Sequence, residues 1–193
     1  MSKVLFLDNF DSFSYNLVDE FRRAGAKVEV WRNDAALGRL AERLEHNDLL
    51  VLSPGPGRPE DEGVALSLVR RAVGKCPVFG VCMGLQLLAT ALGGEVSPAP
   101  RQVHGKLGLI QHDSGGLFEG LENPFGAGRY HSLRVSEMPG GFHATAWGEE
   151  SGERVLMAME DPARRLAGVQ FHPESILTRD GGRLIERVLE WAR

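Results

Sequence analysis

The sequence predicts an α/β fold: a mostly parallel, doubly wound sheet with helices on both faces and added antiparallel hairpins. In the first half of the 193 residues, short apolar runs alternate with segments whose apolar residues recur at helical spacing. Strands and helices that alternate in this way form right-handed crossovers and a largely parallel sheet. From about 95 to 171 the pattern changes to short β-like runs separated by turn residues, which indicates added hairpins. No repeat or linker interrupts the chain, so we expect a single domain over 1–193.

Continuous apolar runs indicate buried strands in the first half, because a central parallel strand is covered on both faces. The third run ends abruptly at Ser53–Gly57, where prolines and glycines alternate. The predicted parallel strands are 4–7, 28–31, 49–52 and 77–81, and the predicted hairpin strands are 107–110, 129–135, 142–147, 154–159 and 166–171.

Five segments have apolar residues at helical spacing. Ser12 precedes the first of these segments and is the predicted N-cap, because a serine hydroxyl can accept from the free N–H groups of a first turn. The predicted helices are 13–21, 37–44, 64–73, 83–92 and 184–191.

Composition excludes several classes of protein. With 42% hydrophobic residues the chain has enough apolar content for a core, so it is not a disordered protein. A net charge of −4 and a pI near 5.9 argue against a nucleic-acid partner. The uncharged stretch 76–94 approaches the length of a membrane span, but Pro77, Gln86 and several glycines interrupt it. A buried strand that leads into a buried helix explains this stretch better, and we expect no membrane association.

Cysteine and histidine usage indicates the compartment and the metal content. The chain has two cysteines, Cys76 and Cys82, and no Cys/His cluster with zinc spacing, so we expect no metal site. The N-terminal apolar run is too short for a signal peptide. We therefore expect a reducing, cytoplasmic setting.

The segment Gly80–Gly84 is the sharpest chemical signal. It has the glycine, nucleophile, glycine pattern of a strand-to-helix elbow, with Cys82 in the nucleophile position. The turn would place the sulfur at a helix N-terminus, where the helix dipole favours a thiolate, and the Met83 N–H would point toward a developing oxyanion. The alternative is a buried structural cysteine, the role that we assign to Cys76.

A thiolate nucleophile needs a base, and the best candidate is His172. It stands at the end of an apolar run, and Glu174 follows two residues later, so in extended backbone both side chains would project to the same face. His46 and His112 also have nearby acids, but in less suitable places. The alternative for His172 is a turn residue that leads into a polar loop.

The loop 53–59 is too rigid for a flexible linker and lacks the Lys-Ser/Thr of a phosphate-binding loop. At the carboxyl edge of a doubly wound sheet it would lie beside the elbow and could supply a second oxyanion donor. The alternative is a rigid connection that binds nothing.

Five separated segments together resemble a known family. They resemble the class I glutamine amidotransferases and, more narrowly, the glutaminase subunit of anthranilate synthase, component II. The first and fourth segments point to the chorismate-using branch of that family. The segments are Leu7–Leu17, Ser53–Gly57, Gly80–Gln86, Arg129–Leu133 and Gln170–Thr178.

The resemblance implies a role for each site residue. Cys82 would attack the side-chain amide of L-glutamine, and His172 and Glu174 would complete the triad. The N–H groups of Gly57 and Met83 would form the oxyanion hole. The implied glutamine-binding residues are Gly55, Pro56, Gly57, Gln86, Ser132 and Leu133.

The resemblance also implies a partner. Ammonia would pass to a chorismate-binding synthase subunit, component I in type, which would make anthranilate for tryptophan biosynthesis. No cofactor is implied for this chain, and any magnesium would belong to the partner. The alternative partner is an aminodeoxychorismate synthase, or the subunit serves both. Leu85 departs from the family pattern, which often has His at this position.

Two other classes of function remain open at this stage. One is a stand-alone γ-glutamyl cysteine hydrolase, and the other is a non-catalytic binding subunit with a relic site. The presence of Cys82, His172, Glu174 and Gln86 argues against the relic.

Overall fold

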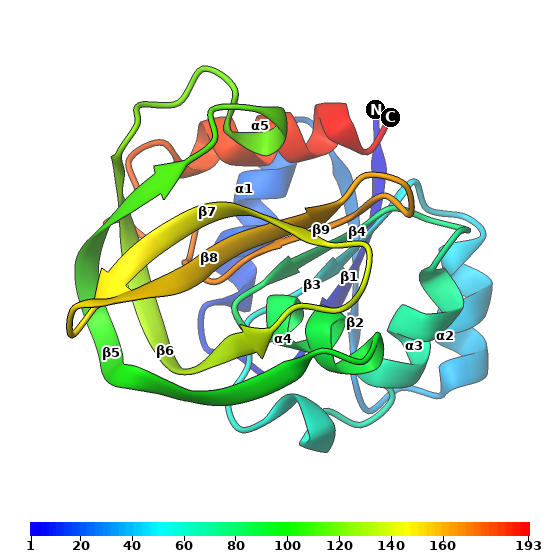
Figure 1. The fold of residues 1–193 in the computed structure, drawn as a ribbon. Coiled ribbons are helices and arrows are strands. Elements are labelled where there is room, and N and C mark those ends of the chain that lie inside the picture. Colours follow the sequence, from blue (N-terminus) through cyan, green and yellow to red (C-terminus); the bar gives the residue numbers. More distant parts are fainter.

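The computed structural model describes residues 1–193, which form one nine-stranded sheet with helices on both faces (Figure 1). The strands are β1 (Lys3–Asp8), β2 (Lys27–Arg32), β3 (Leu49–Leu52), β4 (Val78–Val81), β5 (Glu95–His112), β6 (Phe125–Glu137), β7 (His143–Glu150), β8 (Glu153–Asp161) and β9 (Leu166–Val169). The helices are α1 (Ser14–Arg23), α2 (Leu37–Leu44), α3 (Ala65–Ala72), α4 (Met83–Ala91) and α5 (Gly181–Trp191), with short 3-10 turns η1 (Pro59–Asp61) and η2 (Gly116–Phe118).

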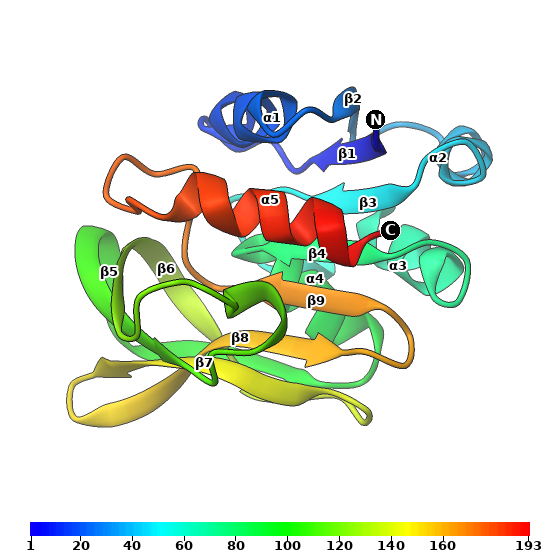
Figure 2. The ribbon, with the colours of Figure 1, turned by 90° about the horizontal axis from the view of Figure 1, so that it is seen from above.

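The sheet has two halves of different character. Its strand order is β2-β1-β3-β4-β9-β8-β7-β5-β6, and Figure 2 shows most of this order from β2 at the top to β7 below. The pairings from β2 to β9 are parallel, and those from β9 to β6 are antiparallel. The predicted α/β fold with helices on both faces and added hairpins is confirmed, and the antiparallel half is larger than predicted.

The unpredicted length lies mainly in β5, which runs from Glu95 instead of 107. This strand is mostly exposed and its pairing with β6 is irregular, with register shifts between Pro98 and Val103 and between His104 and Lys106. A strand that lies away from the core and contains bulges has no apolar alternation, so its sequence does not resemble a strand.

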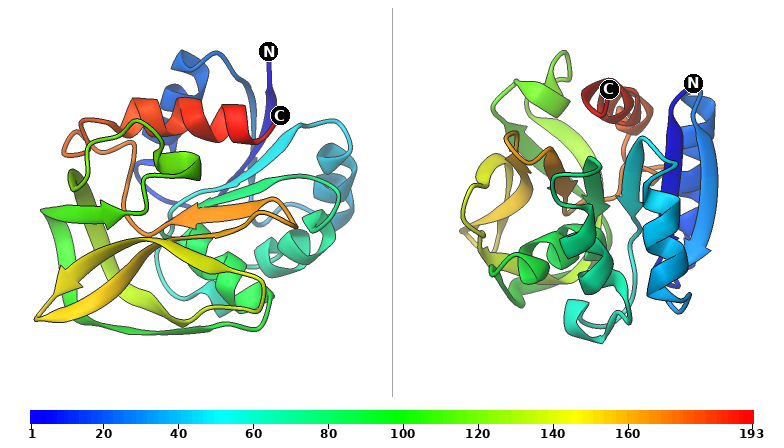
Figure 3. Two further views of the ribbon diagram at one scale, coloured as in Figure 1. Left: turned by 45° about the horizontal axis from the view of Figure 1, so that its top comes forward. Right: turned by 90° about the vertical axis from the view of Figure 1, so that its right-hand side faces the viewer.

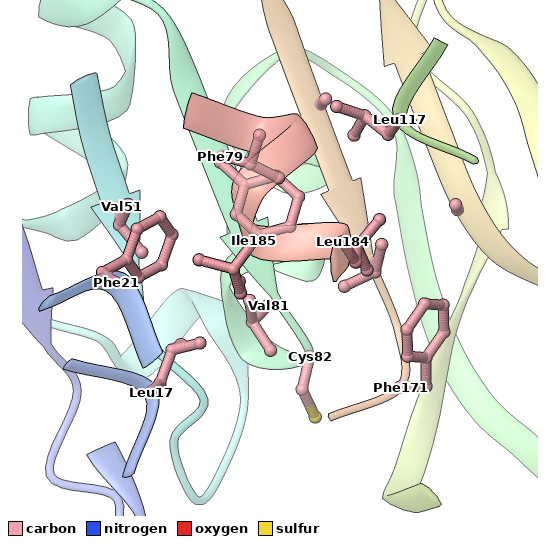
Figure 4. Close-up of a cluster of buried hydrophobic side chains, with 14 of the residues drawn as sticks. Leu17, Phe21, Val51, Phe79, Val81, Cys82, Leu117, Phe171, Leu184 and Ile185 are labelled. Carbon is pink, nitrogen blue, oxygen red and sulfur yellow. The ribbon is translucent and has the colours of Figure 1, made fainter. Parts of the chain in front are cut away.

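Two apolar cores lie on opposite faces of the parallel half. Val4 and Phe6 face one core, which α1 and α5 cover, while Leu5 and Leu7 face the other core, which α2, α3 and α4 cover. Side chains alternate along a strand, so continuous apolar runs supply both cores. Figure 4 shows the first of these cores, with Cys82 at one end.

The predicted N-cap Ser12 is wrong. Helix α1 begins at Ser14, its N-cap residue is Phe13, and no side chain caps it. Asp11 Oδ1 instead accepts from the Phe13 N–H at 2.7 Å, and the Ser14 hydroxyl donates to Asp8 Oδ1 at 2.6 Å. Two carboxylates therefore organise this helix start, and Ser12 lies outside it.

The parallel pairing of β4 with β9 joins segments that are distant in the sequence. Gly80 pairs with Gly168 and Val81 with Val169, and the Cys82 N–H donates to the Val169 carbonyl at 2.8 Å. A Cβ on Gly168 would lie 2.8 Å from the Gly80 carbonyl oxygen, so the pairing requires a glycine there. The chain segments after β4 and β9 consequently leave the sheet side by side.

The two termini lie together at the opposite edge (Figures 1 and 3). Met1 and Arg193 line one cavity of about 520 Å³, together with Asp48 and Pro77, which precede β3 and β4. None of the helices has the length and apolar character required to cross a bilayer.

The close packing of the elbow predicts a stability difference between two glycine variants. A Cβ on Gly84 would overlap the Leu52 carbonyl oxygen on β3, whereas a Cβ on Gly38 in α2 would meet no atom within 4 Å. We expect Gly84→Ala to lower the free energy of unfolding by about 1–3 kcal/mol. Gly38→Ala should raise it by up to about 1 kcal/mol, because alanine loses less backbone freedom in a helix. Urea denaturation measures both, and equal midpoints for the two variants would contradict the packing argument.

Candidate active site

Cys82 lies at the turn between β4 and α4, as the elbow pattern predicted. Its backbone has φ 53° and ψ −101°, a strained conformation for a residue with a side chain. Gly80 and Gly84 permit the turn, since a Cβ on Gly80 would overlap the Gly84 backbone. Cys82 is 6% exposed, and its sulfur points away from the apolar cluster in Figure 4.

Helix α4 begins directly after the sulfur-bearing residue. The Gln86 N–H donates to the Cys82 carbonyl at 3.2 Å, so Met83 is in the first turn. N–H groups in a first turn have no helical carbonyl to bond, and they favour negative charge nearby. Met83 therefore has a first-turn N–H beside Cys82, and its role as an oxyanion donor stays a prediction.

His172 and Glu174 form a close buried pair. His172 Nδ1 lies 2.6 Å from Glu174 Oε1, and the two side chains are 7% and 2% exposed. The predicted contact between these two side chains is confirmed, but the extended backbone predicted for this segment is wrong. The segment is a turn, with the Ser175 N–H donating to the His172 carbonyl at 3.2 Å, and β9 has already ended at Val169.

The protonation of His172 depends on two anions. Burial lowers the pKa of His172, but the Cys82 thiolate and the Glu174 carboxylate outweigh burial and hold this pKa well above its usual value. His172 Nε2 makes no hydrogen bond within the protein. The ring thus has one nitrogen held by Glu174 and one available for proton transfer.

Threonine, serine and glycine hold the turn in place. The His172 N–H donates to the Gly128 carbonyl, and the Thr178 hydroxyl donates to the His172 carbonyl at 2.7 Å while accepting from the Gly128 N–H at 2.9 Å. A Cβ on Gly128 would lie 2.5 Å from Ser175 Oγ, so this approach needs a glycine. The Tyr130 ring contacts the His172 ring edge-on, at 5.0 Å between centroids.

The loop after β3 lies at the same edge, because β3 is the neighbour of β4. Asn9 holds its start: the Asn9 N–H donates to Ser53 Oγ at 2.8 Å and the side-chain amide donates to the Ser53 carbonyl at 2.9 Å. Gly55 is half-buried against Asn9, and Pro56 and Gly57 are exposed. Gly57 has φ +82°, so the loop turns there through a conformation that glycine favours.

The remaining predicted glutamine-binding residues come from α4 and β6. Gln86 is buried, and its amide nitrogen donates to the Leu133 carbonyl at 3.4 Å; Ser132 and Leu133 are half-buried. Leu85 is fully buried in the core under α4, close to Gly168. Although Leu85 stands where the family often has His, the Gln86 side-chain amide still donates to the Leu133 carbonyl.

Sequence reasoning missed Gln170. This side chain is fully buried beside Cys82, and its amide nitrogen lies 3.5 Å from the Cys82 sulfur. A lone amide between apolar residues at the end of a strand was the available signal, because a buried amide needs hydrogen-bond partners.

Sequence reasoning also missed a buried cluster of Arg129, His131 and Glu150. Arg129 Nη2 and Glu150 Oε1 form an ion pair, and His131 Nε2 lies 3.2 Å from the same oxygen. Burial, together with the Arg129 charge, lowers the pKa of His131 to about 4. The neutral ring donates from Nδ1 to the Leu133 carbonyl at 3.0 Å and so holds that carbonyl in place.

A cavity of about 610 Å³ adjoins the His172–Glu174 pair. It lies between α1 and the turn after His172, and its lining includes Phe13, Tyr130 and Ile176. His172 and Glu174 line this cavity and Cys82 does not.

Comparison with known proteins agrees with this geometry. The glutamine amidotransferase class-I family model matches residues 5–191. A Pseudomonas aeruginosa protein named "Anthranilate synthase component 2, pyocyanine specific" is 50% identical over 192 residues, 98% of this chain and 94% of the relative. The "Anthranilate synthase component 2" of Thermus thermophilus is 45% identical over 193 residues, 99% of this chain and 94% of the relative.

A solved structure has the same fold. It is that of a Thermoplasma acidophilum protein assigned as one subunit of a GMP synthase, with a TM-score of 0.83, 22% identity, and coverage of 100% of this chain and 94% of the other. Family match, relatives and fold together lead to one conclusion: the chain belongs to the class-I glutamine amidotransferase family.

Proposed function

We propose that this chain is the glutaminase subunit of an anthranilate synthase. The observation that carries the proposal is the meeting of Cys82 with the bonded His172–Glu174 pair at one sheet edge. The names of the relatives support anthranilate synthase within the family. The two free cysteines fit a reducing compartment, and we assign the enzyme to the cytoplasm.

The proposed reaction begins with the Cys82 thiolate attacking the side-chain amide carbon of glutamine. The carbonyl electrons move to oxygen, which the N–H groups of Gly57 and Met83 would stabilise. The His172 imidazolium gives its Nε2 proton to the amide nitrogen, the C–N bond breaks, and ammonia leaves a thioester on Cys82.

A water molecule then completes the cycle. His172 takes a proton from the water at Nε2, and the oxygen attacks the thioester carbon. The C–S bond breaks, glutamate leaves, and the Cys82 thiolate and His172 imidazolium are restored. Glu174 keeps Nδ1 protonated throughout, because it accepts from that nitrogen at 2.6 Å.

Glutamine would bind beside the sulfur, between Gly55–Gly57 on one side and Ser132–Leu133 on the other. Backbone groups suit the ammonium and carboxylate of an amino acid, which need donors and acceptors at fixed positions. Asn9 and His131 support these two segments from behind.

Ammonia would pass to a chorismate-aminating synthase subunit. Phe13, Tyr15 and Ile176 are 54%, 63% and 96% exposed, and Phe13 and Ile176 line the cavity beside His172. Exposed apolar side chains around a functional cavity are typical of a docking surface. Any magnesium needed for chorismate chemistry is assigned to that partner, and no cofactor to this chain.

Labelling tests the nucleophile. A chloroketone analogue of glutamine should alkylate Cys82, and excess glutamine should protect it. Cys76 is the internal control, because burial raises the pKa of its thiol to about 11 and keeps it protonated. Peptide mapping locates the label, and a label on Cys76 would contradict the assignment.

The raised pKa of His172 gives a pH prediction. An imidazolium that persists above pH 6.5 stabilises the thiolate through neutral pH, so wild-type Cys82 should react with iodoacetamide well below the pH range of a free thiol. His172→Ala should move the profile up toward about pH 8.5, the ordinary value for cysteine. Alkylation rates from pH 5 to 10 give both profiles, and identical curves would exclude His172 as the partner.

The partner assignment predicts separable activities. Glutaminase turnover should be low for this chain alone and should rise when chorismate and the synthase subunit are present. In the complex, Cys82→Ala should abolish product formation from glutamine and leave formation from ammonium salts unchanged. Product analysis should give anthranilate.

Three results would contradict parts of this assignment. Aminodeoxychorismate as the product would favour the alternative partner. Full turnover without any partner would favour a stand-alone hydrolase. Loss of the ammonia-dependent reaction in an assembled Cys82→Ala complex would contradict two separate sites.

A further inference from the structure

Gln170 has no role in the reaction described above, yet its side chain lies between two residues of the site. It follows Val169 at the end of β9, directly beside Cys82 at the end of β4. The Gln170 amide nitrogen is 3.5 Å from Cys82 Sγ, and its amide oxygen accepts from Gln86 Nε2 at 3.2 Å. The side chain is fully buried, so these are its hydrogen bonds rather than bonds to bulk water.

The direction of these hydrogen bonds is set by a backbone carbonyl. The Leu133 carbonyl can only accept, so Gln86 turns its NH2 group toward it. The second N–H of that group donates to the Gln170 oxygen, which leaves the Gln170 NH2 group facing the sulfur. His131 Nδ1 also donates to this carbonyl, at 3.0 Å, and holds it in place. The amide of Gln170 cannot flip without setting its NH2 group against the NH2 group of Gln86 and its oxygen against the Cys82 sulfur.

We propose that Gln170 is a further catalytic residue of this site: its N–H donates to the Cys82 sulfur and holds the thiolate for attack. Gln86 is then a positioning residue for Gln170 as well as a predicted substrate contact. The proposal rests on the proposed glutaminase function for its biological meaning. The hydrogen bond itself bears only on whether the Cys82 sulfur is a thiol or a thiolate.

This donor completes the surroundings of the thiolate. An N–H bond to an anionic acceptor is stronger than one to a neutral acceptor, so the contact favours the thiolate over the thiol. During attack the negative charge moves from sulfur to the substrate oxygen, and the donor keeps the sulfur aligned until the C–S bond forms. Because Gln86 bonds Gln170, substrate contact and nucleophile share one network.

Two substitutions separate this role from simple packing. Gln170→Met keeps the volume and removes the donor, and Gln170→Glu keeps the shape and places a carboxyl oxygen against the sulfur. Both are made in a Cys76→Ala background so that iodoacetamide reports only on Cys82. Thr145→Val is the matched control, because the Thr145 hydroxyl is buried in β7 and bonds nothing.

The pH at half-maximal alkylation is the readout. We expect Gln170→Met to raise it by about one unit, a ten-fold lower thiolate fraction at neutral pH, and Gln170→Glu to raise it further. Thr145→Val should leave it unchanged. Gln86→Met should give a smaller rise together with a higher KM for glutamine, and the double variant should shift no further than Gln170→Met alone.

A wild-type pH profile in either folded Gln170 variant would overturn the inference, whatever its thermal stability. If Gln170→Met does not fold, the nearly isosteric Gln170→Glu provides the same test. Iodoacetamide is not a glutamine analogue, so this result is independent of the proposed function. Wild-type protein that hydrolyses no glutamine with its synthase would refute the function, while a shifted profile would still support Gln170 as the thiolate donor.

Discussion

The site depends on the parallel pairing of β4 with β9. Cys82 follows one strand and the segment Gln170–Glu174 follows the other, and 88 residues of sequence separate Cys82 from Gln170. The pairing continues to the ends of both strands, where the Cys82 N–H donates to the carbonyl of Val169, the last residue of β9. Cys82, His172 and Gln170 thus share a sheet edge because two short strands pair in register.

Small residues make that pairing possible. Gly80 faces α4 and Gly168 faces the Gly80 carbonyl, and both positions lack the space for a Cβ. The helix can therefore begin within one residue of the strand end, and its N-terminus points at the sulfur. Backbone strain at Cys82 accompanies this arrangement, and the fully buried strands β4 and β9 lead into and pair beside the strained residue.

The antiparallel half supports the chemistry from a distance. The ion pair of Arg129 with Glu150 is buried, and such a pair is costly to desolvate. Burial and the Arg129 charge lower the pKa of His131, and its Nδ1 donates to the Leu133 carbonyl. The direction of this hydrogen bond is set by the Leu133 carbonyl, which can only accept, and the low pKa of His131 keeps a further positive charge away from the segment Ser132–Leu133.

The features that could be predicted from the sequence are those specified by nearby residues. The elbow around Cys82 depends on its own glycines, and the parallel strands on their own apolar runs. Glu174 was identified as the partner of His172 because they are close in sequence, although the turn between them was taken for extended chain. Gln170 could not be assigned in the same way, because its hydrogen-bond partners lie 84 and 88 residues away. The part of β5 before residue 107 was missed for a different reason, since a strand segment outside the core carries no apolar pattern.

The two termini lie together at the amino edge of the sheet, and the site lies at the carboxyl edge. Either end can accordingly carry a fused domain, a tag or a surface tether without approaching Cys82. The same arrangement sets a minimum length for any covalent linker that joins a terminus to a protein docked at the carboxyl edge of the sheet. The link must run at least the length of β1, six residues or about 20 Å, before it reaches the other side. A flexible Gly/Ser linker needs about a dozen residues or more to cover that distance on average, so a shorter one would hold the docked protein away from the site.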